Sequence, residues 1–359
     1  MAEFRMPSLG ADMEAGTLAE WLVKPGAQVK RGDLIAVVET QKGAIDVEVF
    51  ESGTVTEFLV EPGTEVPVGT PLAYIDTGEA VPIAAPPPAA VSRSKISPVA
   101  RKRALELGMD VEKLAASLGG VATLEDVERA ATSKPSTAPA AGMRQAIAEA
   151  MARAKREIPH YYLSVTLDFS AVLQRMQSMN AQLPLPERLA YGVFLLRATA
   201  LAVKRYPEFN GYWNAGAFQP SERVNVGVAI SLRQGGLVAP ALFDADKKDL
   251  ATLMREFLDL VNRVRGGHMR SSEVAGPTIT VSSLGEQGVD SAYPIIYPPQ
   301  VAIVGFGTVV ERPWAVAGKT EVRRVITATL AADHRVSDGH RGALFLDQLR
   351  NSLEKPEAL

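Results

Sequence analysis

The sequence predicts a multidomain protein: an all-β flattened barrel at the N-terminus, a small two-helix unit, and a C-terminal α/β domain. Three observations support this fold class. The first 77 residues contain an internal repeat, Ala/Pro-rich stretches at 78–94 and 132–142 interrupt the chain, and helical and strand patterns alternate from 143 to 359. Because a typical domain has about 150 residues, a chain of 359 residues is expected to hold several folded units.

The N-terminal repeat aligns residues 18–40 with residues 55–77 at an offset of 37. In each half a β-rich run is broken by a Pro-Gly turn, which predicts four strands from each half in residues 1–77. The matching pairs are Glu20/Glu57, Leu22/Leu59, Val23/Val60, Pro25/Pro62, Gly26/Gly63, Val29/Val66 and Gly32/Gly69.

A lysine lies between the two halves of this repeat. Strand patterns flank the tripeptide Gln41-Lys42-Gly43, and its glycine can take the positive φ of a tight hairpin. Lys42 is therefore predicted at an exposed tip. A surface lysine is usually only a solubilising charge, but one amine displayed on a rigid turn of a tethered module suits a covalently attached carrier arm.

The middle of the chain reads as a small unit between two tethers. Residues 78–94 and 132–142 are rich in Ala and Pro, and about 17 residues at about 3.1 Å each would reach about 50 Å. Residues 95–131 hold two short helical patterns, Pro98–Leu107 and Leu124–Ala131. So small a unit is expected to be a docking module or a spacer, since its core would be too marginal for an enzyme.

Composition excludes several function classes. The chain has no cysteine, which excludes disulfides, thiolate metal sites and a cysteine nucleophile. A net charge of -3 gives no general electrostatic reason to bind nucleic acid, and no apolar run approaches the roughly 20 residues of a membrane span. The N-terminus has neither signal-peptide nor transit-peptide character. We therefore expect a cytoplasmic, bacterial protein without nucleic-acid or membrane partners.

The C-terminal 217 residues, 143–359, are expected to form one α/β domain with helices over one face of a mixed sheet. Asp249–Val261 is the clearest helix, with an apolar face of Leu250, Leu253, Met254, Phe257, Leu258 and Val261. Buried strands are predicted at Val224–Leu232, Thr278–Val281, Val301–Gly305 and Val325–Leu330.

This domain holds all four histidines of the chain, His160, His268, His334 and His340, and histidine is the usual general base near neutral pH. A lone histidine is more often structural, which is our interpretation of His160 and His268. His334 differs because it follows a buried strand pattern and lies in the charged sequence Asp333-His334-Arg335-Val336-Ser337-Asp338-Gly339. This placement suits a base at the mouth of a site.

These patterns resemble three known modules in one order. Residues 1–77 resemble a lipoyl domain, in which the modified lysine lies in a turn close to E-T-D-K-A, here Glu39-Thr40-Gln41-Lys42-Gly43. The Met-Lys-Met turn of the similarly built biotinyl domain is absent. Residues 95–131 resemble a peripheral-subunit-binding domain through Ser97-Pro98, Arg101, Ala104, Glu106-Leu107-Gly108, Asp110, Gly119-Gly120 and Glu125-Asp126-Val127. Its usual Gly-Arg-Ile is replaced here by Gly119-Gly120-Val121-Ala122.

Residues 143–359 resemble the dihydrolipoamide acyltransferases, which carry the motif D-H-R-x-x-D-G and share an H-x-x-x-D-G core with chloramphenicol acetyltransferase. The resemblance implies a chloramphenicol-acetyltransferase-like domain that moves an acyl group from lipoate on Lys42 to coenzyme A. His334 would be the general base, Ser282 the donor to the oxyanion, and Asp338 an organiser of the loop. A catalytic step between two thiols needs no enzyme cysteine.

The resemblance also implies partners. Residues 95–131 would bind a 2-oxo acid dehydrogenase and dihydrolipoamide dehydrogenase, and the acyltransferase domains would form an obligate trimer within a larger core. Acetyl is the expected acyl group, with branched-chain acyl, succinyl or acetoin-derived acetyl as alternatives. Two alternatives from other classes are a non-catalytic component that anchors the flavoprotein, and a biotin carrier.

Overall fold

The computed structural model describes residues 1–9, 13–40, 43–77, 139–232 and 236–359. The unit expected at 95–131 and the tether at 78–94 lie outside the described residues, as does Lys42.

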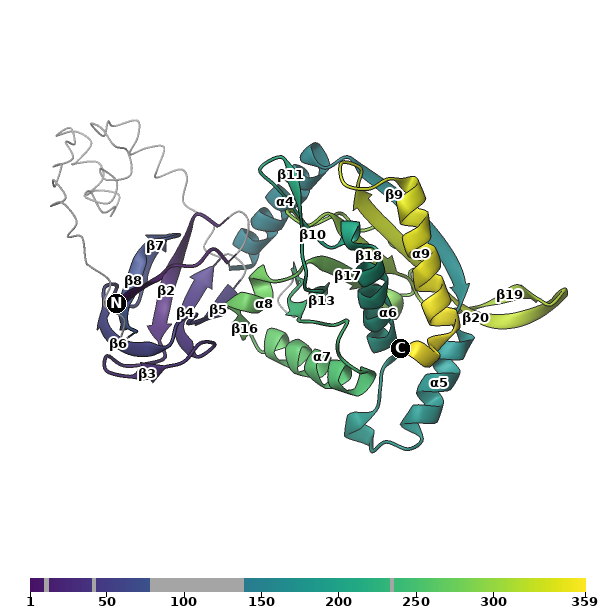
Figure 1. The fold of residues 1–359 in the computed structure, drawn as a ribbon, viewed down its shortest axis with the longest axis horizontal. Coiled ribbons are helices and arrows are strands. Elements are labelled where there is room, and N and C mark those ends of the chain that lie inside the picture. The colour runs from purple at the N-terminus through teal and green to yellow at the C-terminus, as the bar shows by residue number, and fades with distance from the viewer. Residues whose placement is uncertain (10–12, 41–42, 78–138, 233–235) are drawn as a thin grey trace. The chain divides into compact units, whose positions relative to one another are not determined.

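The N-terminal domain is all β, as expected, and its two sequence halves interdigitate (Figure 1). One set of hydrogen-bonded strands runs in the order β1-β8-β6-β3, and the other contains the run β5-β4-β2-β7, so each set takes two strands from each half. The strands are β1 (Ala2–Arg5), β2 (Ala15–Trp21), β3 (Gln28–Val29), β4 (Leu34–Thr40), β5 (Gly43–Glu48), β6 (Gly53–Phe58), β7 (Thr64–Pro67) and β8 (Pro71–Asp76).

The repeat is visible in the packing of this domain. Trp21 and Phe58 occupy equivalent positions of the two halves, and their rings stack at 4.1 Å. Gly26 and Gly63, also equivalent, both have positive φ values, 90° and 85°, which the glycine of each Pro-Gly turn supplies without steric cost. The two halves therefore fold alike and close on each other.

Strands β4 and β5 form the predicted hairpin. Thr40 pairs with Gly43, and the Thr40 hydroxyl donates to the Gly43 carbonyl at 3.0 Å. Gly43 has φ +110°, the left-handed conformation expected at this turn. Only residues 41 and 42 lie between the two strands.

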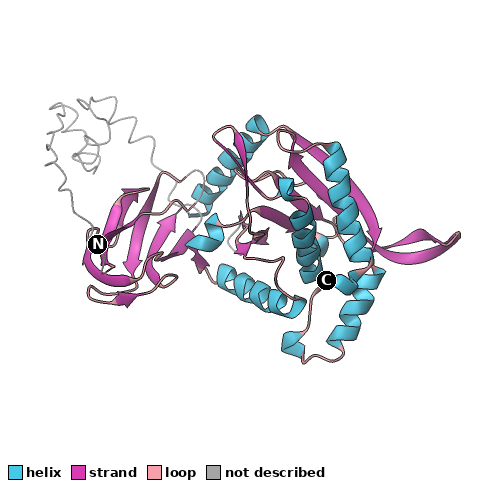
Figure 2. Cartoon of the chain, viewed as in Figure 1, coloured by secondary structure: helices cyan, strands magenta, loops and turns pink. Residues whose placement is uncertain are grey.

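The C-terminal domain is built on a mixed seven-stranded sheet (Figures 1 and 2). Its order is β15-β12-β17-β18-β20-β19, with β9 also pairing with β20. The run β12-β17-β18 is parallel and the other pairings are antiparallel. These strands are β9 (His160–Asp168), β12 (Val226–Val228), β15 (Ala241–Leu242), β17 (Ile279–Ser283), β18 (Ala302–Phe306), β19 (Val310–Val316) and β20 (Lys319–Asp333).

The remaining elements are helices and short strands. The helices are α4 (Pro139–Glu157), α5 (Ser170–Asn180), α6 (Tyr191–Arg205), α7 (Leu250–Arg265), α8 (Ser271–Ala275) and α9 (Gly339–Glu354). The short strands are β10 (Gly211–Asn214), β11 (Ala217–Pro220), β13 (Ile230–Ser231), β14 (Leu237–Val238) and β16 (Met269–Arg270), and single 3₁₀ turns lie at Leu185–Glu187, Pro207–Phe209, Gly285–Gln287 and Pro356–Ala358.

Helices form a layer over one face of the sheet, as the sequence predicted, and the end of α4 reaches the other face. Helix α9 packs on β9 and β20, and α6 packs on α9 and on β17, so these helices form the layer drawn in front of the sheet in Figure 2. On the other face Ala154 and Ile158, from the end of α4, bury Ile303 and Ala331. The end of α4 and the residue after it therefore bury part of the second face.

Helix α7 begins where the sequence predicted and ends at Arg265, one turn beyond the predicted end at Val261. Asp249 is its N-cap and accepts the Thr252 N–H at 2.7 Å, which satisfies one of the free donors of the first turn. Leu250, Leu253 and Met254 are buried as expected, together with Leu260 and Val264, but Leu258 is 38% exposed. Leu258 was wrongly placed on the buried face because the actual stripe continues through Leu260.

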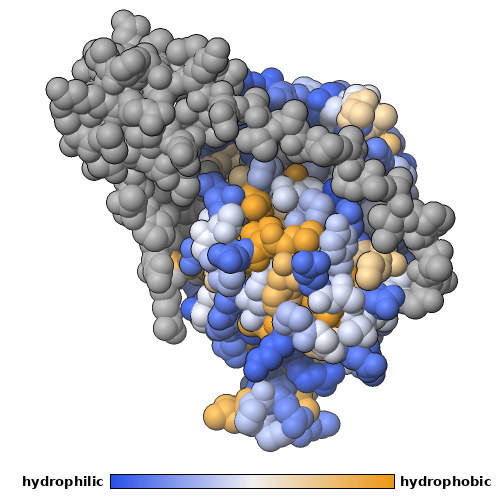
Figure 3. Space-filling model, turned by 90° about the vertical axis from the view of Figure 1, so that its left-hand side faces the viewer, coloured by the Kyte–Doolittle hydropathy of each residue, from blue (hydrophilic) through white to orange (hydrophobic). Residues whose placement is uncertain are grey.

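The described surface is mixed in polarity. In the view of Figure 3, a group of apolar residues is bordered by polar ones. Among the described helices, none has the length and apolar character needed to cross a membrane.

Candidate active site

The turn between β20 and α9 holds His334 in a network of backbone hydrogen bonds. The His334 N–H donates to the Pro159 carbonyl at 3.0 Å, and the N–H groups of Val336 and Ser337 donate to the Asp333 carbonyl at 3.0 and 3.1 Å. The His334 side chain is exposed. A rigid turn therefore presents an accessible imidazole at the end of a buried strand.

A buried ion pair locks the base of this turn. Asp333 is fully buried, and the Arg335 guanidinium donates to its two carboxylate oxygens from Nε at 3.0 Å and from Nη2 at 2.7 Å. The Arg335 backbone N–H donates to the same carboxylate at 2.9 Å. The guanidinium also lies over the Trp213 ring, 4.4 Å from its centroid. Since the residues on both sides of His334 are paired with each other, its backbone has little freedom.

Asp338 fixes the other end of the turn. It is the N-cap of α9, and its carboxylate accepts the Arg341 N–H at 2.9 Å. This hydrogen bond is the main cause of a lowered Asp338 pKa, and the charges of His340 and His334 act in the same direction. Asp338 therefore joins the end of the His334 turn to the first turn of α9.

Ser282 lies far from His334 within one protomer. Ser282 is partly buried on β17 and pairs with Gly305 of β18, which pairs with Thr329 of β20. His334 follows the end of β20, five residues beyond Thr329. At about 3.3 Å per residue along the strand and about 4.8 Å per strand across the sheet, the two residues are about 19 Å apart. The two residues therefore lie toward opposite ends of the strands.

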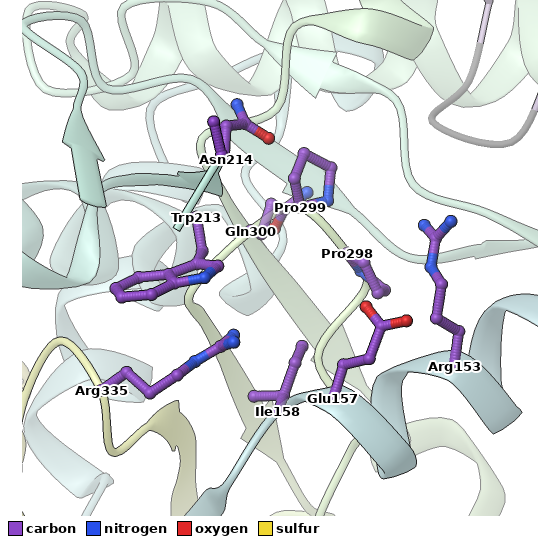
Figure 4. A pocket seen from close by; sticks show the side chains of 10 residues that line it. Arg153, Glu157, Ile158, Trp213, Asn214, Pro298, Pro299, Gln300 and Arg335 are labelled. Carbon is purple, nitrogen blue, oxygen red and sulfur yellow. The ribbon is translucent and has the colours of Figure 1, made fainter. Parts of the chain in front are cut away.

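A pocket opens beside the His334 turn (Figure 4). It has a volume of about 670 Å³, within the range of small-molecule sites, and Arg335 and Trp213 form one of its walls. Arg153 and Glu157 project toward it from α4. The remaining lining residues are Ile158, Asn214, Ala215, Pro298, Pro299 and Gln300. The pocket lies at the edge of the sheet that carries His334, because Gln300 comes just before β18 and Asp333 N–H bonds to Val301.

The other histidines have different surroundings. The His160 ring joins two backbone segments, with Nδ1 2.9 Å from the Ile158 carbonyl and Nε2 accepting the Ile296 N–H at 3.1 Å. These contacts agree with the structural interpretation of His160. His268 and His340 are exposed.

Two aromatic residues near His334 were not singled out from the sequence. Tyr161 lies edge-on to the His334 ring, with centroids 5.4 Å apart, and the Trp213 ring packs against the Arg335 guanidinium. Neither belongs to the D-H-R-x-x-D-G segment. The antiparallel pairing of β9 with β20 brings Tyr161 there, and that long-range pairing has no local sequence signal.

Two family models match the chain. One, described as "2-oxoacid dehydrogenases acyltransferase (catalytic domain)", matches residues 132–359, and another, described as "Biotin-requiring enzyme", matches residues 2–75. Together they cover the two domains described above.

Curated relatives align over nearly the whole chain. The acetyltransferase component of the mitochondrial pyruvate dehydrogenase complex of Caenorhabditis elegans is 31% identical over 99% of this chain and 84% of its own. The acetyltransferase component of the acetoin cleaving system of Bacillus subtilis is 31% identical over 99% and 98%. The lipoamide acyltransferase component of the branched-chain complex of Pseudomonas putida is 29% identical over 99% and 98%.

Solved structures match the C-terminal domain. The dihydrolipoamide acetyltransferase of Azotobacter vinelandii has a TM-score of 0.57 at 27% identity, over 60% of this chain and 90% of that one. The cubic core of a pyruvate dehydrogenase multienzyme complex gives the same values.

Proposed function

Because the chain belongs to the family of 2-oxoacid dehydrogenase acyltransferases, we propose that it is the core component of a 2-oxo acid dehydrogenase complex and transfers an acetyl group from lipoyl-lysine to coenzyme A. Its enzyme class is acyltransferase. Acetyl is the proposed group because most of the named relatives are acetyltransferase components.

One observation carries the assignment of the catalytic residues. The Azotobacter vinelandii structure addresses the role of a serine, a histidine and an asparagine in that protein's mechanism, and the residue numbers differ by 52 between the first two and by 4 between the last two. Ser282, His334 and Asp338 have the same separations. Aspartate replaces asparagine here, and an aspartate can still cap α9 as described.

His334 is the general base of the reaction. Its imidazole takes the proton from the coenzyme A thiol, and the sulfur forms a bond to the acyl carbon. The tetrahedral intermediate then collapses, the bond from carbon to the lipoyl sulfur breaks, and the leaving sulfur takes the proton back from His334. The oxyanion needs a donor in the intermediate, and one such donor contributes about 10²–10³ in rate. Ser282 supplies this hydroxyl.

The active site is shared between protomers. His334 and Ser282 are about 19 Å apart along one sheet, far beyond the reach of a common tetrahedral intermediate. The oxyanion beside His334 is therefore contacted by Ser282 of the partner subunit, in the trimer that the family resemblance implies. The trimers assemble further, as in the cubic core to which this domain is similar.

Lys42 carries the acyl donor. The hairpin of β4 and β5 fits this role, since Thr40 pairs with Gly43 and leaves a two-residue tip between two well-packed strands. A lipoyl group on Lys42 would supply the thiol that holds the acyl group. By the family resemblance, the Ala/Pro-rich sequence at 78–94 would be the tether of this domain, and residues 95–131 would dock the 2-oxo acid dehydrogenase and dihydrolipoamide dehydrogenase.

The function is tested on the full-length protein by transfer of acetyl, succinyl and isobutyryl groups from their coenzyme A thioesters to free dihydrolipoamide. We expect acetyl to dominate and His334→Ala to lose activity by about 10²–10⁴-fold. His340→Ala is the matched control, because His340 is an exposed histidine six residues away, and it should keep full activity. If the assembled wild-type protein transfers none of the three groups, the non-catalytic anchoring role replaces this proposal.

The Lys42→Arg variant distinguishes the contribution of the N-terminal domain from that of the C-terminal domain. It should retain transfer to free dihydrolipoamide but lose turnover in a complex reconstituted with the dehydrogenase components, and mass spectrometry should show loss of the lipoyl group. Lipoylation of the variant at another lysine would contradict the assignment of Lys42.

A further inference from the structure

Tyr161 is in contact with His334 and with the turn that follows it. Strand β9 pairs with β20 so that Tyr161 lies opposite Ala332. Its ring meets the His334 ring at 5.4 Å between centroids and 74° between planes, an edge-to-face arrangement that aromatic rings favour. One protomer therefore supplies both rings.

The Tyr161 hydroxyl is anchored in the same turn. Its oxygen lies 2.8 Å from the Ser337 hydroxyl, and Ser337 is itself buried and bonded through its N–H to the Asp333 carbonyl. Burial raises the pKa of Tyr161 to about 12, so the phenol stays protonated at neutral pH. Tyr161 thus joins strand β9 to the residue three positions after His334.

Helix α9 closes the remaining side of the Tyr161 ring. A Cβ atom on Gly342 would lie 3.0 Å from Tyr161 Cε2 and Oη and 2.8 Å from Leu163 Cδ1. The helix backbone can therefore approach the ring closely only because residue 342 has no side chain. The ring is held between α9 on one side and the imidazole on another, with its hydroxyl fixed at a third point.

From this geometry we infer that Tyr161 is a positioning residue for the acyltransfer reaction, which sets the orientation of the His334 imidazole through ring contact and fixes the His334–Ser337 turn through its hydroxyl. The inference rests on the proposed role of His334 as the base. His334 is exposed and its backbone alone is fixed by the network described above, so its side-chain torsions need a neighbour to select one orientation. Tyr161 is that neighbour.

Three variants test the inference in the transfer assay. Tyr161→Leu removes the ring and should lower kcat about 10–100-fold, since small misplacement of a catalytic group can cost about 10², while KM for acetyl-CoA and for dihydrolipoamide changes less than about twofold. Tyr161→Phe keeps the ring and loses one hydrogen bond, so we expect a loss of about 2–10-fold. Ser337→Ala should match Tyr161→Phe, and the double variant should be no worse than either one.

Tyr162→Leu is the matched control, since it makes the same change one residue along β9, where successive side chains point to opposite faces. It should keep kcat within about twofold. Rates are compared per assembled protein, with melting temperature and particle size measured for each variant. If Tyr161→Leu is folded and assembled with an unchanged kcat, the inference is wrong. If instead His334→Ala remains active, the proposed base is wrong and the loss of activity in Tyr161 variants needs another cause.

If Tyr161→Leu does not assemble, Tyr161→Phe and Ser337→Ala still decide the question. Equal and non-additive losses in kcat support the inference, and full activity in both overturns the part played by the hydroxyl.

Discussion

Removing the Arg335 side chain should destabilise the protein far more than removing an arginine from an exposed ion pair. Asp333 is fully buried, and the Arg335 side chain is 28% exposed. Loss of one partner from a buried pair costs about 3–5 kcal/mol because a charge stays buried without compensation. The partial exposure of Arg335 favours the lower end, and its contact with Trp213 adds about 0.5–1 kcal/mol. We expect a cost of about 3–4 kcal/mol for Arg335→Met.

This cost can be measured by thermal unfolding of the full-length protein at one fixed concentration. A domain of this size loses about 2–4 °C per kcal/mol, so Arg335→Met should melt about 10 °C lower. Arg335→Lys keeps the charge but not the paired hydrogen bonds, and should fall between the variant and wild type. Arg312→Met is the matched control. Its pair with Asp290 has a similar distance, 2.8 Å, but side-chain exposures of 52% and 66%, so its loss should cost at most about 1 kcal/mol. Equal melting temperatures for Arg335→Met and Arg312→Met would refute this reasoning.

Two further predictions concern the shared site and His160. The Ser282→Ala and His334→Ala proteins should each be nearly inactive. Trimers reassembled from a mixture of the two should regain part of the activity, because some interfaces then pair an intact serine with an intact histidine. A mixture as inactive as its components would contradict a shared site. Burial lowers the His160 pKa below its usual value, so the unfolded chain binds more protons than the folded chain does. The free energy of unfolding should therefore fall as the pH drops below about 6.5, and level off below the pKa of His160 in the folded protein. The melting temperature of the His160→Gln variant should change less with pH between 7.5 and 5 than that of the wild type. An equal change in both proteins would exclude His160 as the cause.

Much of the N-terminal domain could be predicted because its evidence is local and repeated. The alternation of Ile45 and Val47, the paired Pro-Gly turns and the glycine at position 43 each fix short pieces of backbone, and the offset between halves relates them. The exchange of strands between the two halves could not be predicted in the same way, since the sequence of one strand does not specify which strand it pairs with.

The proposed base could be picked out from the sequence, whereas the residues that surround it could not. His334 and Asp338 lie in one short segment, so their relation is local. Tyr161 lies more than 170 residues earlier, and Trp213 belongs to a separate hairpin of β10 and β11. Only the antiparallel pairing of β9 with β20 and the approach of Gly342 bring Tyr161 to His334. Leu258 is an error of another kind, a burial that was predicted but does not occur. The apolar pattern of the helix placed it on the buried face, but tertiary packing leaves it exposed.

The structure also separates two requirements of the proposed reaction. The base depends on residues of its own protomer, namely the Asp333–Arg335 pair, Tyr161 and Ser337, all of which contact the turn directly. The proposed oxyanion donor, Ser282, would come from the opposite strand end of a partner subunit's sheet, so the proposed transfer would depend on assembly. Variants of Tyr161 should therefore lower kcat without changing the concentration dependence of activity. Dissociation of the trimer should instead remove activity even when the turn around His334 is intact, and activity of an isolated protomer would show that Ser282 is not the donor.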